Sequence, residues 1–178
     1  MMDSALGRRT ESIGFGFDPT RCSGCMACVV ACLDENDLPG GHSFRSVIRQ
    51  ERVVDGDVQI TFISLACFHC GEAPCLAVCP RNAIYKSEAN GLVLVDPKHC
   101  IGCRACLLVC PFGAPQFSKG GSMQKCHLCC QRLLHEMEPA CVKICPTRAL
   151  DFGTLETLAR KQARQAGMRI LNSYMDGG

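Results

Sequence analysis

This chain of 178 residues has no long apolar segment, and the pattern of its first residues does not predict a leader. No apolar run approaches the roughly 20 residues that a membrane-spanning helix needs, so the sequence predicts no direct membrane span. Arg8 and Arg9 stand near the amino terminus, but no apolar stretch follows them, which argues against a secretory or twin-arginine leader. We therefore expect a soluble, cytoplasmic protein of a reducing compartment.

A strong charge of one sign is also missing, since 19 Lys and Arg residues face 17 Asp and Glu residues. The chain has no lysine-rich block and no alternation of basic with aromatic residues, so no nucleic-acid partner is expected. Cysteine, in contrast, is abundant, with 17 residues. This density is typical of a secreted disulfide scaffold or of a metal-cluster protein, and the odd total argues against complete pairing.

The spacing of the cysteines favours the metal-cluster class. One run has the C-x2-C-x2-C-x3-C-P pattern of bacterial ferredoxins, in which three cysteines bind one cubane iron–sulfur cluster and the fourth crosses to a second cluster. A disulfide framework has no need of this repeat, whereas a cubane needs several thiolates from one tight loop. The residues of the run are Cys100, Cys103, Cys106, Cys110 and Pro111.

A second run supplies the neighbouring cluster that a crossing cysteine requires. It differs from the first run only by a loop two residues longer before its third cysteine. Exchange of the fourth cysteines predicts two [4Fe-4S] clusters, whose ligand sets we name site 3 and site 4. Site 3 comprises Cys67, Cys70, Cys75 and Cys110, and site 4 comprises Cys100, Cys103, Cys106 and Cys79.

The outer parts of the chain carry two further cysteine groups. The first group repeats C-x2-C-x2-C-x3-C over residues 22–32, but Leu33 replaces the proline, so we expect its helical turn to end less sharply. The last group is irregular, because either Cys129 or Cys130 can follow Cys126. We prefer Cys129, since every other group begins with C-x2-C, and Cys130 is then a packed thiol. Ligation by Cys130 stays open as the alternative.

The same exchange between the outer groups completes sixteen ligands and four [4Fe-4S] clusters. The chain ends would then fold back over the middle and close loops of more than about 100 residues, each closure restricting the unfolded chain by roughly 4 to 5 kcal/mol. Cluster assembly should consequently be coupled to folding. Site 1 comprises Cys22, Cys25, Cys28 and Cys145, and site 2 comprises Cys126, Cys129, Cys141 and Cys32.

Between the cysteine groups, the sequence predicts strands and one helix. Residues 43–54 and 58–64 flank a glycine-containing turn and alternate as in a β-hairpin, which either docks a partner or covers one edge of the cluster core. Residues 83–86 and 92–95 are typical of two short strands. Residues 154–166 are typical of a helix capped by Thr154, packing on the body or on a partner.

These elements predict the fold class α+β, with two bacterial-ferredoxin-like modules of two clusters each. The inner module is expected at 67–117, and the outer, discontinuous module at 12–33 and 118–152. Residues 34–66 form the inserted β-hairpin, and residues 153–178 form the C-terminal helix and tail.

Four thiolates on every cluster leave no open iron for a substrate, so we expect electron transfer and no catalysis. Arg21, His99 and Lys125 each precede the first cysteine of a group. A cation there would stabilise the more negative reduced cluster, although an ordinary surface role explains these residues equally well. His69 and His127 lie inside cysteine loops, where thiolates already suffice as ligands.

The order and spacing of the groups resembles the four-cluster iron–sulfur subunits of the dimethyl sulfoxide reductase superfamily. The resemblance spans about residues 13–160 and includes Cys110-Pro-Phe-Gly-Ala-Pro115 and Cys145-Pro-Thr-Arg-Ala-Leu-Asp-Phe-Gly153. The sequence is similar as well to the small iron–sulfur subunits of tungsten aldehyde oxidoreductase complexes. The resemblance implies single-electron relay to or from a large molybdenum or tungsten bis-pterin catalytic subunit. A further redox or anchor subunit can join such complexes, and an exported partner can carry the iron–sulfur subunit across a membrane.

Two other functions stay open from the sequence. A free polyferredoxin would use the same clusters but dock transiently with several enzymes, and it would elute alone near 19 kDa on gel filtration. A zinc-stapled binding module would use C-x2-C pairs, which also bind zinc, but it has no use for the repeated ferredoxin pattern. The sequence determines neither the substrate of the partner nor the direction of electron flow.

Overall fold

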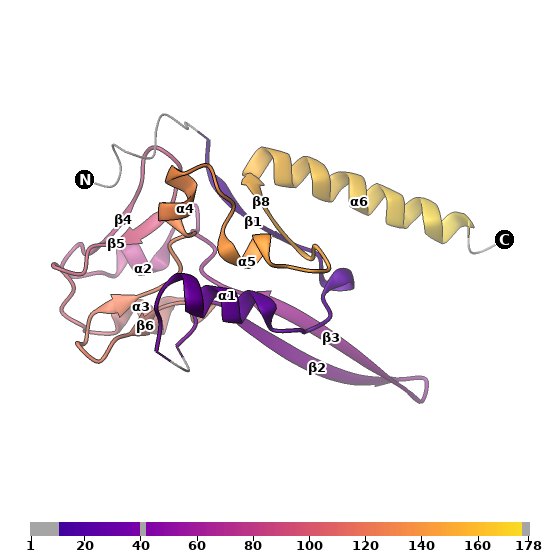
Figure 1. The fold of residues 1–178 in the computed structure, drawn as a ribbon, viewed down its shortest axis with the longest axis horizontal. Helices are drawn as coiled ribbons and strands as arrows, with labels where there is room; N and C mark the ends of the chain where they lie inside the picture. Colours follow the sequence, from indigo (N-terminus) through magenta and orange to yellow (C-terminus); the bar gives the residue numbers. More distant parts are fainter. Residues whose placement is uncertain (1–10, 40–41, 176–178) are drawn as a thin grey trace.

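The computed structural model describes residues 11–39 and 42–175, so Arg8, Arg9 and the end of the predicted tail lie outside the described residues. The described residues form four two-stranded antiparallel sheets and several short helices, which agrees with a mixed helix and strand fold (Figure 1). In chain order the elements are β1 (Ile13–Phe17), η1 (Pro19–Arg21), α1 (Ala27–Glu35), β2 (Ser46–Val54), β3 (Asp57–Leu65), α2 (Pro74–Ala77), β4 (Ile84–Lys86), β5 (Val93–Val95), α3 (Ala105–Val109), β6 (Gln116–Phe117), β7 (Met123–Gln124), α4 (Cys130–Leu134), α5 (Ala140–Lys143), β8 (Leu150–Thr154) and α6 (Leu155–Met175).

The first and last strands pair with each other and bring distant parts of the chain together. β1 runs antiparallel to β8, with Ile13 opposite Thr154 and Phe17 opposite Leu150. The Ile13 N–H also donates a hydrogen bond to the Asn90 carbonyl at 3.1 Å, which ties this sheet to the turn between β4 and β5. The chain ends therefore fold back over its middle, as the cysteine pattern predicts.

The helices that follow the cysteine loops end where proline stops them. α2, α3 and α5 each end one or two residues before a cysteine that proline follows. Proline disfavours the helical conformation of the residue before it and lacks an N–H for the helix. α1 has Leu33 at the corresponding position and continues to Glu35. The expectation of a less sharply ended turn is confirmed.

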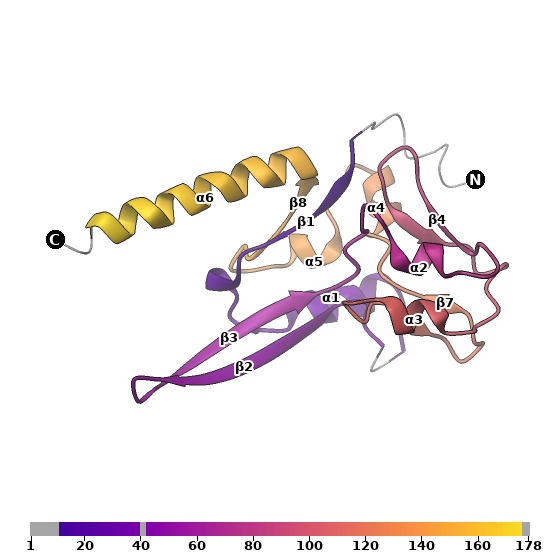
Figure 2. The same cartoon turned by 180° about the vertical axis from the view of Figure 1, so that it is seen from behind.

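β2 and β3 form a long ribbon that projects from the body (Figures 1 and 2). Asp55 and Gly56 connect the strands with φ of 54° and 89°, the positive values that a two-residue type I′ turn needs. The ribbon begins at Ser46 and not at Ser43, because the Ser43 hydroxyl accepts a hydrogen bond from the Arg45 N–H at 3.2 Å and forms a local turn. Only the base of the ribbon is buried, so the hairpin does not cover the cluster core along its length.

The C-terminal helix is longer than the sequence predicts, because α6 continues to Met175. Thr154 caps it as expected, since its hydroxyl accepts a hydrogen bond from the Thr157 N–H at 3.2 Å. Leu155 and Leu158 lie against the glycines of β1, and further along the helix Lys161 pairs with Asp151 and Arg169 pairs with Asp18. The C-terminal end of the helix projects from the body (Figure 1). None of the helices in the described ranges combines the length and the apolar character that crossing a membrane requires.

Candidate metal centres

All 17 cysteines lie in the described residues, and none of them forms a disulfide. Fifteen are buried or half-buried, and only Cys25 and Cys103 are exposed. The free cysteines agree with the metal-cluster class that their spacing favours. Most of the cysteine side chains therefore lie in the interior of the fold.

Sites 3 and 4 each surround one cavity in the middle of the chain. The loop before α3 and the cysteine after α2 line the cavity of site 4, with Ile84 and Phe117 in its wall. Stacked rings of Phe68 and Phe112, with centroids 4.2 Å apart, lie beside the cavity of site 3. The cysteines that line these cavities are Cys79, Cys100, Cys103 and Cys106 for site 4, and Cys67, Cys70, Cys75 and Cys110 for site 3.

Site 2 surrounds a third cavity, which is assembled from both ends of the chain. Its wall also includes the rings of Phe15 and Phe44 and the side chain of Arg45. Cys32 comes from α1, whereas the other three cysteines come from the segment that contains α4 and α5. The four cysteines lining the cavity are Cys32, Cys126, Cys129 and Cys141.

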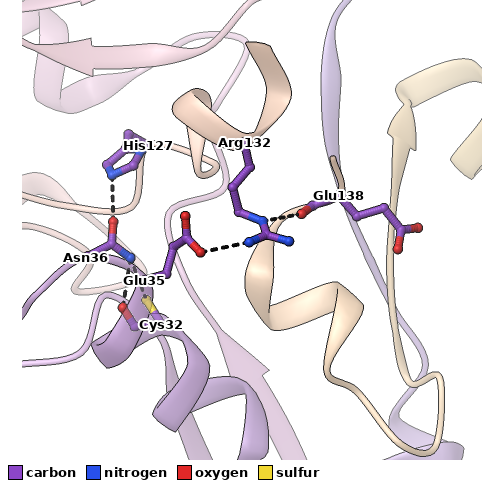
Figure 3. A network of polar contacts seen from close by, with 6 residues as sticks. All are labelled: Cys32, Glu35, Asn36, His127, Arg132 and Glu138. Atoms are coloured by element: carbon purple, nitrogen blue, oxygen red, sulfur yellow. Dashed lines mark hydrogen bonds and ion pairs between the residues drawn. The ribbon is translucent and has the colours of Figure 1, made fainter. Parts of the chain in front are cut away.

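A polar network holds α1 against the segment of site 2 (Figure 3). The Asn36 side chain donates to the Cys32 carbonyl at 2.8 Å and hydrogen bonds to the ring of His127 at 2.7 Å. Arg132 pairs with Glu35 at 2.9 Å and donates its Nε–H to the Glu138 carbonyl at 2.7 Å. These contacts join the residues that follow Cys32 to the segment that carries the other three cysteines of site 2.

Site 1 forms at the contact between α1 and α5. Cys28, Cys145 and Cys22 pack in one apolar cluster around Val142 and Leu150. Cys25 lies in the exposed loop between Cys22 and Cys28 and is not part of that cluster. The structure thus brings three of the four predicted cysteines together and leaves the fourth at the surface.

Cys130 lies apart from the cavity of site 2. Its side chain lines a different, larger cavity, and its Sγ lies 3.4 Å from Nδ1 of His127. The Cys130 N–H donates to the same Nδ1 at 3.2 Å. This placement favours Cys129 over Cys130 as the fourth member of site 2.

The cysteine quartets fit a cluster of several irons. Within the part of the chain that the structure describes, no three Cys, His, Asp or Glu side chains converge closely enough to hold a single metal ion. Each quartet of sites 2, 3 and 4 instead surrounds a mostly apolar space, with thiols on several sides of it. A cubane, whose irons take one cysteine each, needs thiols spaced around a volume in this way.

Comparison with known proteins agrees with this geometry. A family profile described as a 4Fe-4S dicluster domain matches residues 58–155, and a second profile of the same description matches residues 21–84. The B subunit of anaerobic dimethyl sulfoxide reductase from Escherichia coli (strain K12) is 39% identical over 171 residues, which cover 91% of this chain and 83% of that protein. The sequence belongs to this family of iron–sulfur subunits.

One further relative of this iron–sulfur subunit is named as an electron-transfer subunit. Thiosulfate reductase electron transfer subunit PhsB of Salmonella typhi is 44% identical over 143 residues, covering 78% of this chain and 74% of that protein. Protein NrfC of Escherichia coli (strain K12) is 38% identical over 146 residues, which cover 80% of this chain and 66% of that protein. The expectations of four [4Fe-4S] clusters and of a non-catalytic electron-transfer subunit are confirmed.

Burial raises the pKa of several thiols in this iron–sulfur subunit. It raises the pKa of Cys126 to about 12 and the pKa of Cys129 to about 11. Burial also acts to raise the pKa of Cys79, but backbone N–H donors together outweigh it and lower that pKa. One of them, the Ala83 N–H, donates to the Cys79 Sγ at 3.3 Å. Binding of iron to the buried thiols must therefore release protons.

The cations that the sequence analysis singles out differ in their surroundings. His99 pairs with Asp96 at the surface, and Arg21 lies in the short helix η1. Lys125 is buried, lines the cavity of site 3 and donates to the carbonyls of Val93 and Cys126. Only Lys125 among the three lies where its charge is shielded from water.

The two histidines have other hydrogen-bond partners. The Val93 N–H donates to Nδ1 of His69 at 3.0 Å, and burial lowers the pKa of His69 well below its usual value, so its ring is neutral. His127 is engaged by Asn36 and Cys130. Sequence reasoning missed Arg45, because it lies in the stretch without cysteines and no motif includes it.

Proposed function

We propose that sites 1 to 4 each hold one [4Fe-4S] cluster and that the chain is a row of one-electron relays. When bound, each cluster supplies a redox group that accepts or gives one electron. Support comes from the cavities: the cysteines of sites 2, 3 and 4 each line one of them, and every one of these quartets includes a cysteine from a distant segment. The proposed modules are an inner unit with sites 3 and 4 and an outer unit with sites 1 and 2.

The packing of the cysteines supports the order 1–2–3–4 for the relays. Cys141 of site 2 shares an apolar cluster with Cys28 of site 1. Cys32 of site 2 shares another with Cys67 of site 3, and Cys75 of site 3 shares a third with residues of site 4. Neighbouring sites therefore pack through common side chains, which keeps water out of the path between them.

Electrons would enter and leave at the two ends of this row. Cys25 of site 1 and Cys103 of site 4 are the only exposed cysteines of the 17. Every cysteine of the two inner sites is buried or half-buried. An exposed ligand loop lets a redox group of another protein approach, so sites 1 and 4 are the proposed contact points.

The proposed partner is a large molybdenum or tungsten bis-pterin catalytic subunit. This proposal comes from the relatives, which are named as parts of dimethyl sulfoxide reductase and thiosulfate reductase. A further redox or anchor subunit would take the opposite end of the row. The cytoplasm, or the compartment of an exported catalytic partner, stays the predicted location.

The exchange of the fourth cysteines is tested by pairs of substitutions and by counting irons anaerobically. Cys25→Ala with Cys145→Ala removes two ligands of one proposed cluster, whereas Cys25→Ala with Cys32→Ala removes ligands of two. From about sixteen irons, four per cubane, we expect the first pair to lose about four irons and the second about eight. The opposite result would contradict the exchange.

The partner is tested by purification of the complex from the native host. We expect the chain to elute with a large subunit that contains molybdenum or tungsten. A brown protein that elutes alone near its own mass of 19.3 kDa would instead indicate a free polyferredoxin. A colourless protein that contains zinc would rule out the relay.

A further inference from the structure

Arg45 is a buried arginine immediately before β2, at the base of the ribbon. Its side chain lines the cavity of site 2, and only 3% of the residue is exposed. Nη1 donates to the Ser64 hydroxyl at 3.0 Å, and the guanidinium carbon lies 4.5 Å from the centre of the Phe15 ring. These contacts fix the position of the guanidinium between β1 and β3.

The guanidinium has an unsatisfied donor. Nη2 of Arg45 is buried and makes no hydrogen bond within the described residues. No carboxylate of the described residues forms an ion pair with Arg45 either. A buried charge without a counter-charge is strongly unfavourable, so such groups are usually paired. An anion beside Arg45 is therefore what its surroundings require.

The thiols around Arg45 identify that anion. Cys126 and Cys141 of site 2 line the same cavity as Arg45. Cys28 of site 1 lies on the other side of Ser64, with its Sγ 3.5 Å from the hydroxyl to which Arg45 donates. A [4Fe-4S] cluster with four thiolates is an anion, and one-electron reduction makes it more negative. A fixed cation in a low-dielectric cavity stabilises the reduced form more than the oxidised form.

We propose that Arg45 raises the redox potential of the cluster in site 2 and so tunes one inner relay of the row. The inference rests on the ligand set proposed for site 2. Arg45 is a positioning residue that carries no electron itself: the electron arrives from the neighbouring cluster and passes to the next one, and no bond forms or breaks.

The test is a redox titration of the complete cluster-loaded chain, followed by electron paramagnetic resonance, with dithionite as reductant and ferricyanide as oxidant. Arg45→Gln removes the charge and keeps a hydrogen-bond donor. We expect one of the four one-electron steps to move to lower potential, with the ratio of reduced to oxidised cluster falling at least about tenfold at a fixed potential, or 59 mV. The other three steps should move less.

Three matched variants separate charge from structure. Arg45→Lys keeps the charge, and its step should stay within about threefold of the wild-type ratio. Arg49→Gln removes an arginine of β2 that is 56% exposed and paired with Glu51, and it should move no step. Lys125→Gln removes the buried cation beside site 3, and it should move a different step from Arg45→Gln.

The outcomes separate this inference from the proposed relay. Four intact clusters with an unmoved step in Arg45→Gln, or an equal shift in Arg45→Lys, would overturn the role of Arg45 and leave the relay standing. Fewer than four clusters in the unmodified chain would overturn the relay itself. If Arg45→Gln fails to bind its iron, the result for Arg45→Lys decides. An Arg45→Lys chain with four clusters and unmoved redox steps supports the role of the charge. An Arg45→Lys chain that lacks clusters, or in which a redox step moves, rejects it.

Discussion

Replacement of Gly102 by alanine tests whether the loop of site 4 depends on a close backbone contact. Gly102 lies between Cys100 and Cys103 and has φ of +68°. A Cβ at this position would stand 2.4 Å from the carbonyl oxygen of Gly121, in the turn between β6 and β7. Because that atom belongs to the backbone, only a shift of the turn or of the cysteine loop relieves the contact.

Gly113→Ala is the matched control for Gly102→Ala. Gly113 has a similar φ of +60°, but a Cβ there would meet nothing within 4 Å. Both substitutions incur the left-handed strain of an L-residue, about 1–2 kcal/mol. Gly102→Ala adds the cost of over-packing, about 1–3 kcal/mol. We expect Gly102→Ala to be more destabilising than Gly113→Ala by that second amount.

The assay is anaerobic unfolding in guanidinium chloride, followed by the visible absorption of the clusters. The guanidinium chloride concentration at the unfolding midpoint should be lower for Gly102→Ala than for Gly113→Ala. In Gly102→Ala, the electron paramagnetic resonance signal of one cluster should disappear before those of the other clusters. Equal midpoints for the two variants would refute the reasoning, because the strain of a positive φ would then explain the whole effect.

Two further predictions concern the surroundings of site 2. Cys130→Ser should keep all four clusters and Cys129→Ser should disturb one, because Cys130 lies outside the cavity; iron analysis of the two variants decides between them. Arg132→Met should lower the free energy of unfolding by about 1–3 kcal/mol, because it breaks a half-buried ion pair and a charged hydrogen bond. Arg160→Met, whose ion pair is 80% exposed on the arginine side, should change it by less than about 0.5 kcal/mol in the same measurement.

The cysteine groups could be predicted from the sequence because cluster chemistry acts through short spacings. C-x2-C-x2-C folds into one loop around a cubane, and a following proline ends the helix before the fourth cysteine. The turn at Asp55 and Gly56 was predictable for a similar reason, since few residues tolerate two successive positive φ values. In each case the constraint lies within a few residues, where sequence pattern has its strongest effect.

Features that depend on distant contacts could not be predicted. Arg45 occurs in a stretch with no motif, and only the packing of β1 and β3 around it encloses its charge. The two-residue strands β6 and β7 carry no alternation long enough to recognise. The extension of α6 to Met175 was missed because the predicted apolar stripe ends at Ala166, beyond which the residues of the helix are exposed.

The absence of proline from the first cysteine group is a local sequence feature that affects a distant contact. Leu33 permits α1 to continue three residues past Cys32, and the residues gained include Glu35, with Asn36 directly after it. Both residues contact the distant segment of site 2, through Arg132 and His127 (Figure 3). A proline at position 33 would remove an N–H from α1 and end the helix early. The departure from the ferredoxin pattern is therefore what allows α1 to reach across to the other half of its proposed cluster site.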